Sequence, residues 1–399
     1  MKFISLLLPM LLSKPALGQV KNQSSQIDMA RKTTLPMELV FDKEELKGTP
    51  FLYINHQETN LIPSLQAGLR NFVKRRGDPI AAVMVAEVST GKILALVQGK
   101  SPKKWGAKTH TALHTGFPAA SLFKTIVASA AIEVAGVATR KKRGLVGGCA
   151  RVRPSGRWMV PNMRGKQYQI DMKVAYGHSC NGFFAKLALN NTGLGPLIAY
   201  AHRFGWDRII PADFDIPKSP ITVPMVGRSS AHTIGKFAAG FGNVKSSTAH
   251  ALWRILAIGN NGIPQRLSLF TGQSLPHAQK PIIKADTSKE LRDIMKKTVR
   301  GGTASSAFAR GKYRQFKNKV GGKTGTLTGK SPSGVTTWFS GLYPIENPEI
   351  AVTALTVIND YWIFKAPNLA AEAIYLWHKQ KKIMLSKAKV PNIKKTELR

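Results

Sequence analysis

Strand-like segments lie at both ends of this chain, and helical segments lie between them. Residues 81–88 and 93–97 are rich in β-branched and apolar side chains and flank Ser89-Thr90-Gly91-Lys92, whose glycine and short polar residues suit a hairpin turn. Further strand-like runs occur at 319–326, 336–343 and 350–358. Two early and three late strands around a long helical insertion predict one sheet assembled from both ends of a domain, and therefore an α+β fold.

The expected helices surround and fill this insertion. Residues 61–75 repeat apolar side chains every four positions, which is typical of an amphipathic helix. Residues 122–134 form an Ala-rich apolar segment between Pro118 and Gly136, which are start and stop signals for a buried helix. Helices are also expected at 183–189, 247–258 and 369–381.

The chain termini are expected to lie outside this domain. Lys2 precedes an apolar run at 3–12, about as long as the core of a secretory signal peptide and well short of the roughly 20 residues that span a bilayer. Ala16 and Gly18 are small residues suited to cleavage after Gly18. We expect a signal peptide at 1–18, a flexible arm at 19–49, the folded domain at 50–383 and a basic tail at 384–399. A signal peptide predicts secretion across the inner membrane, to the periplasm or the cell wall.

The chain is strongly basic. Its 59 Lys and Arg residues outnumber 21 Asp and Glu residues, and the net charge of +38 predicts anionic surroundings. A secreted chain without a zinc-finger, RRM-like or helix-turn-helix pattern is not expected to bind nucleic acid.

Metal and cofactor sites are not expected. His110 and His114 have the spacing of two ligands on a helix, but Gly and Pro follow at once and no Glu lies between them. The Gly-Lys-Ser and Gly-Lys-Thr segments lack the upstream glycine of a phosphate-binding loop. Two cysteines cannot build a disulfide scaffold. We expect Cys180 to be a buried free thiol rather than half of a bridge to Cys149.

The motifs favour nucleophilic catalysis. A serine becomes a good nucleophile when a base lies within reach, and a lysine one helical turn later is such a base if its ammonium group deprotonates easily. Among four Ser-x-x-Lys matches, only Ser121-Leu122-Phe123-Lys124 lies at an expected helix start. Ser179-Cys180-Asn181 and Lys323-Thr324-Gly325 follow in that order, each the only match of its pattern.

Together these motifs resemble the signature of penicillin-binding proteins and serine β-lactamases. The resemblance covers about residues 50–380 and includes the segments 91–95, 117–124, 239–252, 259–262, 301–304, 321–326 and 338–344. It implies a β-lactamase/transpeptidase-like fold, with a central antiparallel five-stranded sheet flanked by terminal helices and a mostly helical inserted subdomain. The long interval between Asn181 and Lys323 is similar to that of high-molecular-mass transpeptidase domains.

The resemblance implies an acyl-enzyme on Ser121. Lys124, held neutral by burial and by the charge of Lys323, takes the proton of the Ser121 hydroxyl. Asn181 holds the Lys124 side chain by a hydrogen bond, and Ser179 relays a proton to the leaving amine. Lys323 lies near the terminal carboxylate of the substrate.

The remaining site residues follow from the same resemblance. Thr324, Gly325 and Thr326 form a strand edge on which an extended acyl-D-Ala-D-Ala peptide pairs as an added strand. The backbone N–H groups of Ser121 and Thr326 form an oxyanion hole, worth about 3 kcal/mol per donor in enzymes generally.

The expected function is a penicillin-binding serine D,D-transpeptidase that cross-links the cell wall, with peptidoglycan stem peptides and β-lactam antibiotics as partners and no cofactor. D,D-carboxypeptidation and endopeptidation share this acyl-enzyme and stay open. A divergent serine β-lactamase is less favoured, because the Glu that delivers water in class A enzymes has no counterpart motif. The complete motif set argues against a catalytically silent wall-binding protein. The few residues before residue 50 predict no glycan-polymerising domain.

One basic stretch adds a hypothesis. Residues 134–170 contain no acid and many Lys and Arg residues, including Arg151, Arg153 and Arg157. We expect a solvated cationic loop here, and we add the hypothesis that it binds anionic wall polymers or stem-peptide carboxylates.

Overall fold

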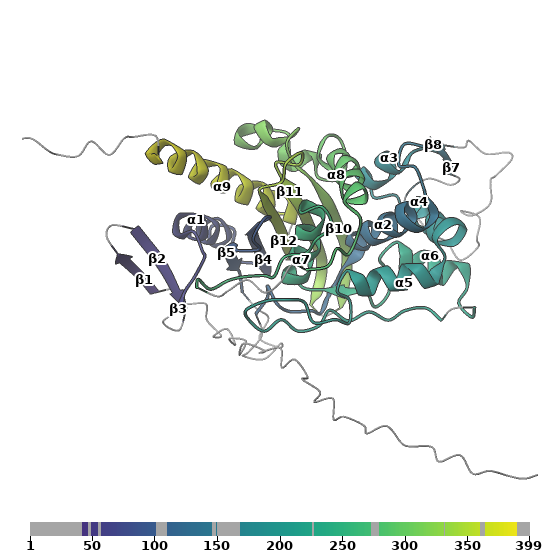
Figure 1. Cartoon of the computed structure of the whole chain (residues 1–399), viewed down its shortest axis with the longest axis horizontal. Helices are drawn as coiled ribbons and strands as arrows, with labels where there is room; N and C mark the ends of the chain where they lie inside the picture. The colour runs from purple at the N-terminus through teal and green to yellow at the C-terminus, as the bar shows by residue number, and fades with distance from the viewer. Residues whose placement is uncertain are drawn as a thin grey trace, which may run out of the picture.

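A computed structural model describes residues 42–46, 49–54, 57–100, 110–145, 149, 168–225, 227–272, 279–330, 332–359 and 364–388 (Figure 1). Its centre is a five-stranded antiparallel sheet with the strand order β10-β11-β12-β4-β5. The strands are β4 (Ala81–Glu87), β5 (Ile93–Gln98), β10 (Gly321–Lys330), β11 (Ser333–Tyr343) and β12 (Ile350–Ile358). The expected sheet, built from both ends of the domain, is confirmed.

The pairing of β12 with β4 joins the two ends of the domain. Val352 lies opposite Val85, and all nine residues of β12 are buried. A continuously apolar strand is the pattern of a sheet that is covered on both faces, which explains why this segment shows no alternation of polar and apolar side chains. At the other end of the sheet, β10 is an edge strand.

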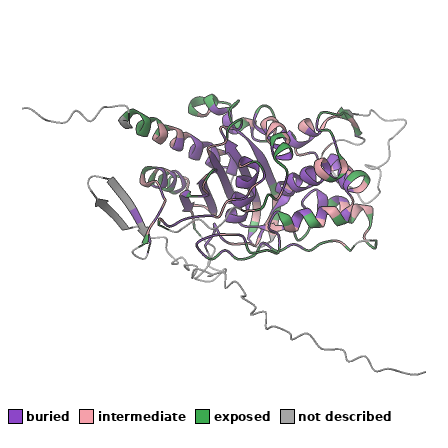
Figure 2. Cartoon of the chain, viewed as in Figure 1, coloured by how far each residue is buried: buried purple, intermediate pink, exposed green. Residues whose placement is uncertain are grey.

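Helices cover the two faces of the sheet. On one face, α1 (Pro63–Lys74) and α9 (Ala366–Ala388) bury Leu69 and Ile374 against Val83 and Val352. On the other face lies α7 (Thr248–Gly259), all of whose residues are buried, with α8 (Ala285–Val299) nearby. Figure 2 shows the buried residues gathered in the sheet and in the helix surfaces that face it.

The segment between β5 and β10 is mostly helical, as the sequence predicts. The first eight residues of its Ala-rich helix, α2, are all buried. Its helices are η2 (Ala120–Phe123), α2 (Lys124–Ala135), α3 (Met172–Gly177), α4 (Asn181–Leu187), η3 (Ala188–Thr192), α5 (Leu194–Arg203), α6 (Ala231–Ala238), α7, α8, η4 (Ser305–Phe308) and η5 (Gly311–Phe316). Four short strands pair within it: β6 (Phe117–Pro118) with β9 (Lys245–Ser246), and β7 (Arg143–Leu145) with β8 (Tyr168–Ile170).

The domain edges differ in part from the expected boundaries. A small antiparallel sheet of β1 (Asp42–Leu46), β2 (Thr49–Ile54) and β3 (Gln57–Glu58) begins inside the expected arm at 19–49. At the other end, α9 extends into the expected tail at 384–399. The expected signal peptide at 1–18 lies outside the described residues. Within the described part of the chain, no helix is long and apolar enough to cross a bilayer.

A glycine allows two segments of the insertion to approach closely beside the Ser-x-x-Lys motif. Gly240 has a φ of 87°, and a Cβ placed on it would lie 1.9 Å from the carbonyl oxygen of Ala120, which itself has a φ of 49°. A side chain at residue 240 would therefore push the backbone that carries Ser121.

Gly240→Ala is expected to destabilise the protein more than Gly242→Ala does. Both glycines have a positive φ, and an alanine costs about 1–2 kcal/mol in such a conformation. Only residue 240 meets backbone atoms, since a Cβ on Gly242 has no neighbour within 4 Å. The additional loss in the free energy of unfolding, about 2 kcal/mol, is measured by urea denaturation of both variants. Equal losses would contradict the close contact with Ala120.

Candidate active site

The Ser-x-x-Lys motif places a serine and a lysine in direct contact. Ser121 lies in the 3-10 helix η2, and Lys124 is the first residue of α2. The Nζ atom of Lys124 lies 2.7 Å from the Oγ atom of Ser121. One helical turn thus brings the amine to the hydroxyl, as the sequence predicts.

The Ser-x-Asn motif completes the surroundings of the lysine. It lies at the turn between α3 and α4, where Ser179 has a φ of 57°. Lys124 Nζ lies 2.5 Å from Asn181 Oδ1, 3.0 Å from the Ser179 carbonyl oxygen and 3.2 Å from Ser179 Oγ. With Ser121 Oγ, four oxygen atoms surround one nitrogen. A neutral amine suits this arrangement, because its lone pair can accept the proton of one of the hydroxyl groups.

The third motif brings a second lysine from the sheet edge. Lys323 lies on β10, and its Nζ donates to Ser179 Oγ at 2.9 Å and to the Thr324 carbonyl oxygen at 2.9 Å. The Ser179 hydroxyl therefore lies between the amines of Lys124 and Lys323. A proton can pass through this hydroxyl to a group bound beside it.

Burial controls the charge of both lysines. Lys124 is fully buried, and burial lowers its pKa well below the ordinary value, with a further lowering from the charge of Lys323. Burial likewise lowers the pKa of Lys323 to about 7. The neutral form of Lys124, which can act as a base, is therefore favoured.

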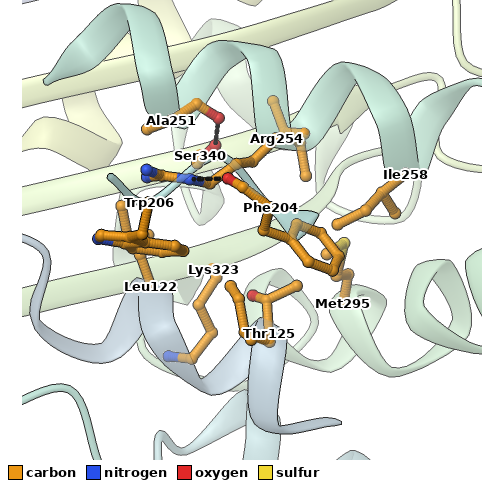
Figure 3. A pocket seen from close by; sticks show the side chains of 12 residues that line it. Leu122, Thr125, Phe204, Trp206, Ala251, Arg254, Ile258, Met295, Lys323 and Ser340 are labelled. Carbon is orange, nitrogen blue, oxygen red and sulfur yellow. Dashed lines mark hydrogen bonds between the residues drawn. The ribbon is translucent and has the colours of Figure 1, made fainter. Parts of the chain in front are cut away.

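A largely apolar environment lies beside Lys323. A small cavity of about 30 Å³ is lined by the stem of Lys323 and by side chains such as Phe204, Trp206 and Met295. In Figure 3 the Lys323 side chain points its nitrogen away from Phe204 and Met295. The buried guanidinium of Arg254 lies 3.5 Å from the centre of the Trp206 ring and donates to the Phe204 carbonyl oxygen at 2.8 Å.

An open cavity of about 450 Å³ lies in front of the motifs. It is lined by five of the predicted site residues: Ser121, Ser179, Asn181, Thr324 and Thr326. Lys124 and Lys323 lie buried behind it. Gly325 does not line it; a Cβ there would lie 3.2 Å from the Ala119 carbonyl oxygen, so glycine lets β10 approach the nucleophile segment.

Six lining residues were not predicted as site residues. Thr303 and Trp338 lie in segments that carry the family resemblance, and Thr303 Oγ1 lies 2.5 Å from Thr324 Oγ1. The family resemblance of these segments was therefore the sequence signal that could have identified both residues. Phe241 likewise lies in the resembling segment 239–252, whereas the remaining three lie outside these segments and reach the cavity only through the fold: Thr337, Lys365 and Pro367.

The expectation of a free Cys180 thiol is wrong. Cys149 and Cys180 form a disulfide, with their Cα atoms 4.3 Å apart. In addition, the Asn181 N–H donates to the Cys149 carbonyl oxygen at 2.8 Å. Both contacts tie residue 149 to the Ser-x-Asn motif. The sequence did not reveal this, because a lone pair of cysteines says nothing about whether the chain returns to bring them together.

Two expectations concern residues outside the catalytic motifs. Among the described residues, no group of three or more His, Cys, Asp or Glu side chains could hold a metal ion. Arg151, Arg153 and Arg157 lie outside the described residues, so the wall-polymer hypothesis for 134–170 stays a prediction.

A serine beside a buried lysine, with a second serine within hydrogen-bond distance of the same amine, is the arrangement that a serine acyl-transfer centre requires. The chain matches the family model of the penicillin binding protein transpeptidase domain over residues 81–375 and belongs to this family. It is an acyltransferase-type member of the penicillin-binding transpeptidases.

Solved structures share its fold. PBPA from Mycobacterium tuberculosis is 20% identical, with a TM-score of 0.62 and coverage of 80% of each chain. Its imipenem acyl-enzyme complex is 22% identical, with a TM-score of 0.64 and coverage of 81% of this chain and 79% of the other. The D,D-transpeptidase domain of a peptidoglycan glycosyltransferase from Eggerthella lenta is 18% identical, with a TM-score of 0.62 and coverage of 86% and 95%. The predicted family and fold are confirmed. No curated protein sequence is significantly similar to this chain.

Loss of the disulfide is expected to destabilise the protein. Cys149→Ser opens a loop with a sequence separation of 31 residues, which predicts a loss of about 2–4 kcal/mol in the free energy of unfolding. Denaturation with and without a reductant measures it. The reductant should lower the stability of the unmodified protein and leave Cys149→Ser unchanged; equal stability of the unmodified protein and the variant would contradict a structural role for the bridge.

The rate of acylation by benzylpenicillin should depend on pH with a maximum. Lowering the pH protonates Lys124 and removes the base, so the second-order rate constant falls on the acid side. Raising the pH through about 7 removes the charge of Lys323 and with it any attraction of the ligand carboxylate to this side chain, so the rate constant is expected to fall there too. Lys323→Arg keeps its charge at high pH and should remove the alkaline fall. Circular dichroism at each pH checks that the fold persists, and a rate independent of pH would refute both assignments.

Proposed function

We propose that this protein is a serine D,D-transpeptidase that cross-links peptidoglycan stem peptides through an acyl-enzyme on Ser121. The contact of a buried Lys124 amine with the Ser121 hydroxyl, at 2.7 Å, is the observation that carries the proposal. Neutral Lys124 takes the hydroxyl proton as Ser121 Oγ attacks the carbonyl carbon between the two D-Ala residues. The C–N bond then breaks, and an acyl ester remains on Ser121.

The leaving D-Ala needs a proton on its amine. The Ser179 hydroxyl supplies it and is recharged from Lys124, 3.2 Å away, so that the proton taken from Ser121 ends on the product. An acceptor amine then attacks the ester, gives up its proton by the reverse route and forms the cross-link. Both half-reactions use the same three groups.

The edge strand β10 supports recognition of the donor peptide. Its free edge can pair with an extended chain, which directs the terminal carboxylate toward Lys323 and the hydroxyl of Thr324. The N–H groups of Ser121 and Thr326 stabilise the oxyanion, each by about 3 kcal/mol.

β-Lactam hydrolysis is disfavoured by the composition of the open cavity. A hydrolase needs a base that activates water against the acyl-enzyme, and none of the described residues that line this cavity is an Asp or Glu. A β-lactam should therefore form a long-lived adduct on Ser121.

We also propose that the protein acts outside the inner membrane, in the periplasm or at the cell wall. The signal-like sequence at 1–18 supports this location, and the basic stretch at 134–170 supports contact with anionic wall polymers.

Labelling with a fluorescent penicillin tests the proposed acyl-enzyme. A stable adduct of the expected intact mass should form on the unmodified protein and on Ser89→Ala, which removes an exposed Ser-x-x-Lys serine in the β4–β5 turn. Ser121→Ala should form none. An adduct that disappears within minutes indicates a β-lactamase, and a folded protein that forms none refutes the proposal.

The acceptor is tested separately. The protein is incubated with an acyl-D-Ala-D-Ala peptide and an amino-acid acceptor, and the products are identified by mass. The aminolysis product supports transpeptidation, whereas hydrolysis alone indicates a D,D-carboxypeptidase.

A further inference from the structure

One buried tyrosine contacts the chain at or beside each of the three catalytic motifs. Tyr176 lies in α3, shortly before Ser179, and is completely buried. Its hydroxyl oxygen lies 2.7 Å from Oγ1 of Thr125, the residue after Lys124. Its carbonyl oxygen accepts from the N–H of Ser179 at 3.1 Å. Its ring faces the Nζ atom of Lys323, which lies 5.4 Å from the ring centre.

The Lys323 amine has no carboxylate partner among the described residues. Its Nζ donates to two oxygen atoms, Ser179 Oγ and the Thr324 carbonyl oxygen, each at 2.9 Å. An ammonium group has three N–H donors, so these two oxygens leave one donor for another electron-rich group. The face of the Tyr176 ring carries partial negative charge and lies within the roughly 6 Å at which it attracts a cation.

The neighbouring elements bring further cations to Lys323. Lys124 of α2 shares the Ser179 hydroxyl with it, and Arg254 of α7 lines the same small cavity as its stem. From α8 and β11 this cavity receives Met295 and Ser340, which carry no charge. Burial itself lowers the pKa of Lys323 to about 7. The charged form of Lys323 therefore depends on the two oxygen atoms and on the aromatic ring.

We propose that Tyr176 is a positioning residue whose ring face keeps Lys323 in its charged form and beside the Ser179 hydroxyl in the ligand-free enzyme. The proposal rests on the proposed function, because that function needs a charged Lys323 to attract the terminal carboxylate of the ligand. The hydroxyl group of Tyr176 has a separate role, since it joins α3 to α2 through Thr125. The two roles are separable, because phenylalanine keeps the ring and loses the hydroxyl.

The charge of Lys323 can be followed without any acylation. In protein with isotopically labelled lysine, the NMR signal of the carbon next to the amine reports its protonation, and Lys323→Arg identifies the signal by its absence. Phenylalanine and its mono-, di- and pentafluorinated analogues at position 176 keep the shape of the ring and remove the negative charge of its face stepwise. The pH midpoint of Lys323 should fall along this series, by about 0.5 or more in total.

The natural variants separate the ring from the hydroxyl. Tyr176→Phe should leave the midpoint unchanged and lower the stability in urea, because only the contact with Thr125 is lost. Tyr176→Leu should lower the midpoint as the pentafluorinated ring does. The matched control is the same fluorinated series at Phe184, a buried residue of α4 whose ring centre lies 6.1 Å from that of Tyr176. Among the described cation–ring contacts Phe184 faces no cation, so the midpoint should not change.

Acylation by benzylpenicillin gives the second readout. A midpoint lowered by about 0.5 leaves about threefold less charged Lys323 at about pH 8 and changes the charge little at about pH 6, and the rate constant should follow. An equal loss at both pH values, or a midpoint that stays the same along the fluorinated series, overturns the proposal and leaves Tyr176 a structural residue. If the unmodified protein forms no adduct, the proposed function is refuted, and the midpoints alone then decide on Tyr176.

Discussion

The exclusion of water from the Lys124 amine is the constraint on which the rest of the site depends. A lysine at the surface is protonated at neutral pH and cannot take a proton from Ser121. Burial shifts this preference toward the neutral amine at a cost in stability, because a buried polar group loses its hydration. The four oxygen atoms around the nitrogen offset part of this cost. Each oxygen belongs to a residue of the Ser-x-x-Lys or Ser-x-Asn motif. The residues that stabilise the Lys124 amine are therefore also residues of the proposed reaction.

Three distant parts of the chain must meet to build this environment. The helix that begins at Lys124 belongs to the insertion, the turn that carries Ser179 precedes α4, and Lys323 belongs to an edge strand near the end of the domain. A strained φ at Ser179 and the Cys149–Cys180 bridge both occur at the turn. The position of the Ser179 hydroxyl between two amines is thus held by covalent and noncovalent contacts rather than by local helix propensity.

Sequence reasoning succeeded where a local pattern determines the structure. The five strands of the main sheet and the helix after Ser121 carry their own local composition and end signals. The motif order identified Ser121, Lys124, Ser179, Asn181 and Lys323, which the fold brings together. Sequence reasoning failed where residues that are distant in the sequence come together only in the folded chain. Lys365 and Pro367 line the cavity from the segment before α9 and from the first turn of α9, positions that look like an ordinary connection in the sequence. The disulfide between Cys149 and Cys180 was missed for the same reason, because it forms only where the chain folds back on itself.

The basic character of the chain connects its surroundings with its chemistry. A cation near a lysine disfavours the ammonium form, and the charge of Lys323 does so for Lys124. Protein-wide positive charge acts in the same direction, although solvent and salt screen the distant contributions. A net charge of +38 thus favours the neutral base, and the same charge would attract an acidic polymer. An anionic ligand close to Lys124 would raise the pKa of Lys124 and so oppose the preference for the neutral amine. Carboxylate recognition at Lys323, as proposed above, would therefore have to hold the negative charge away from the Lys124 amine.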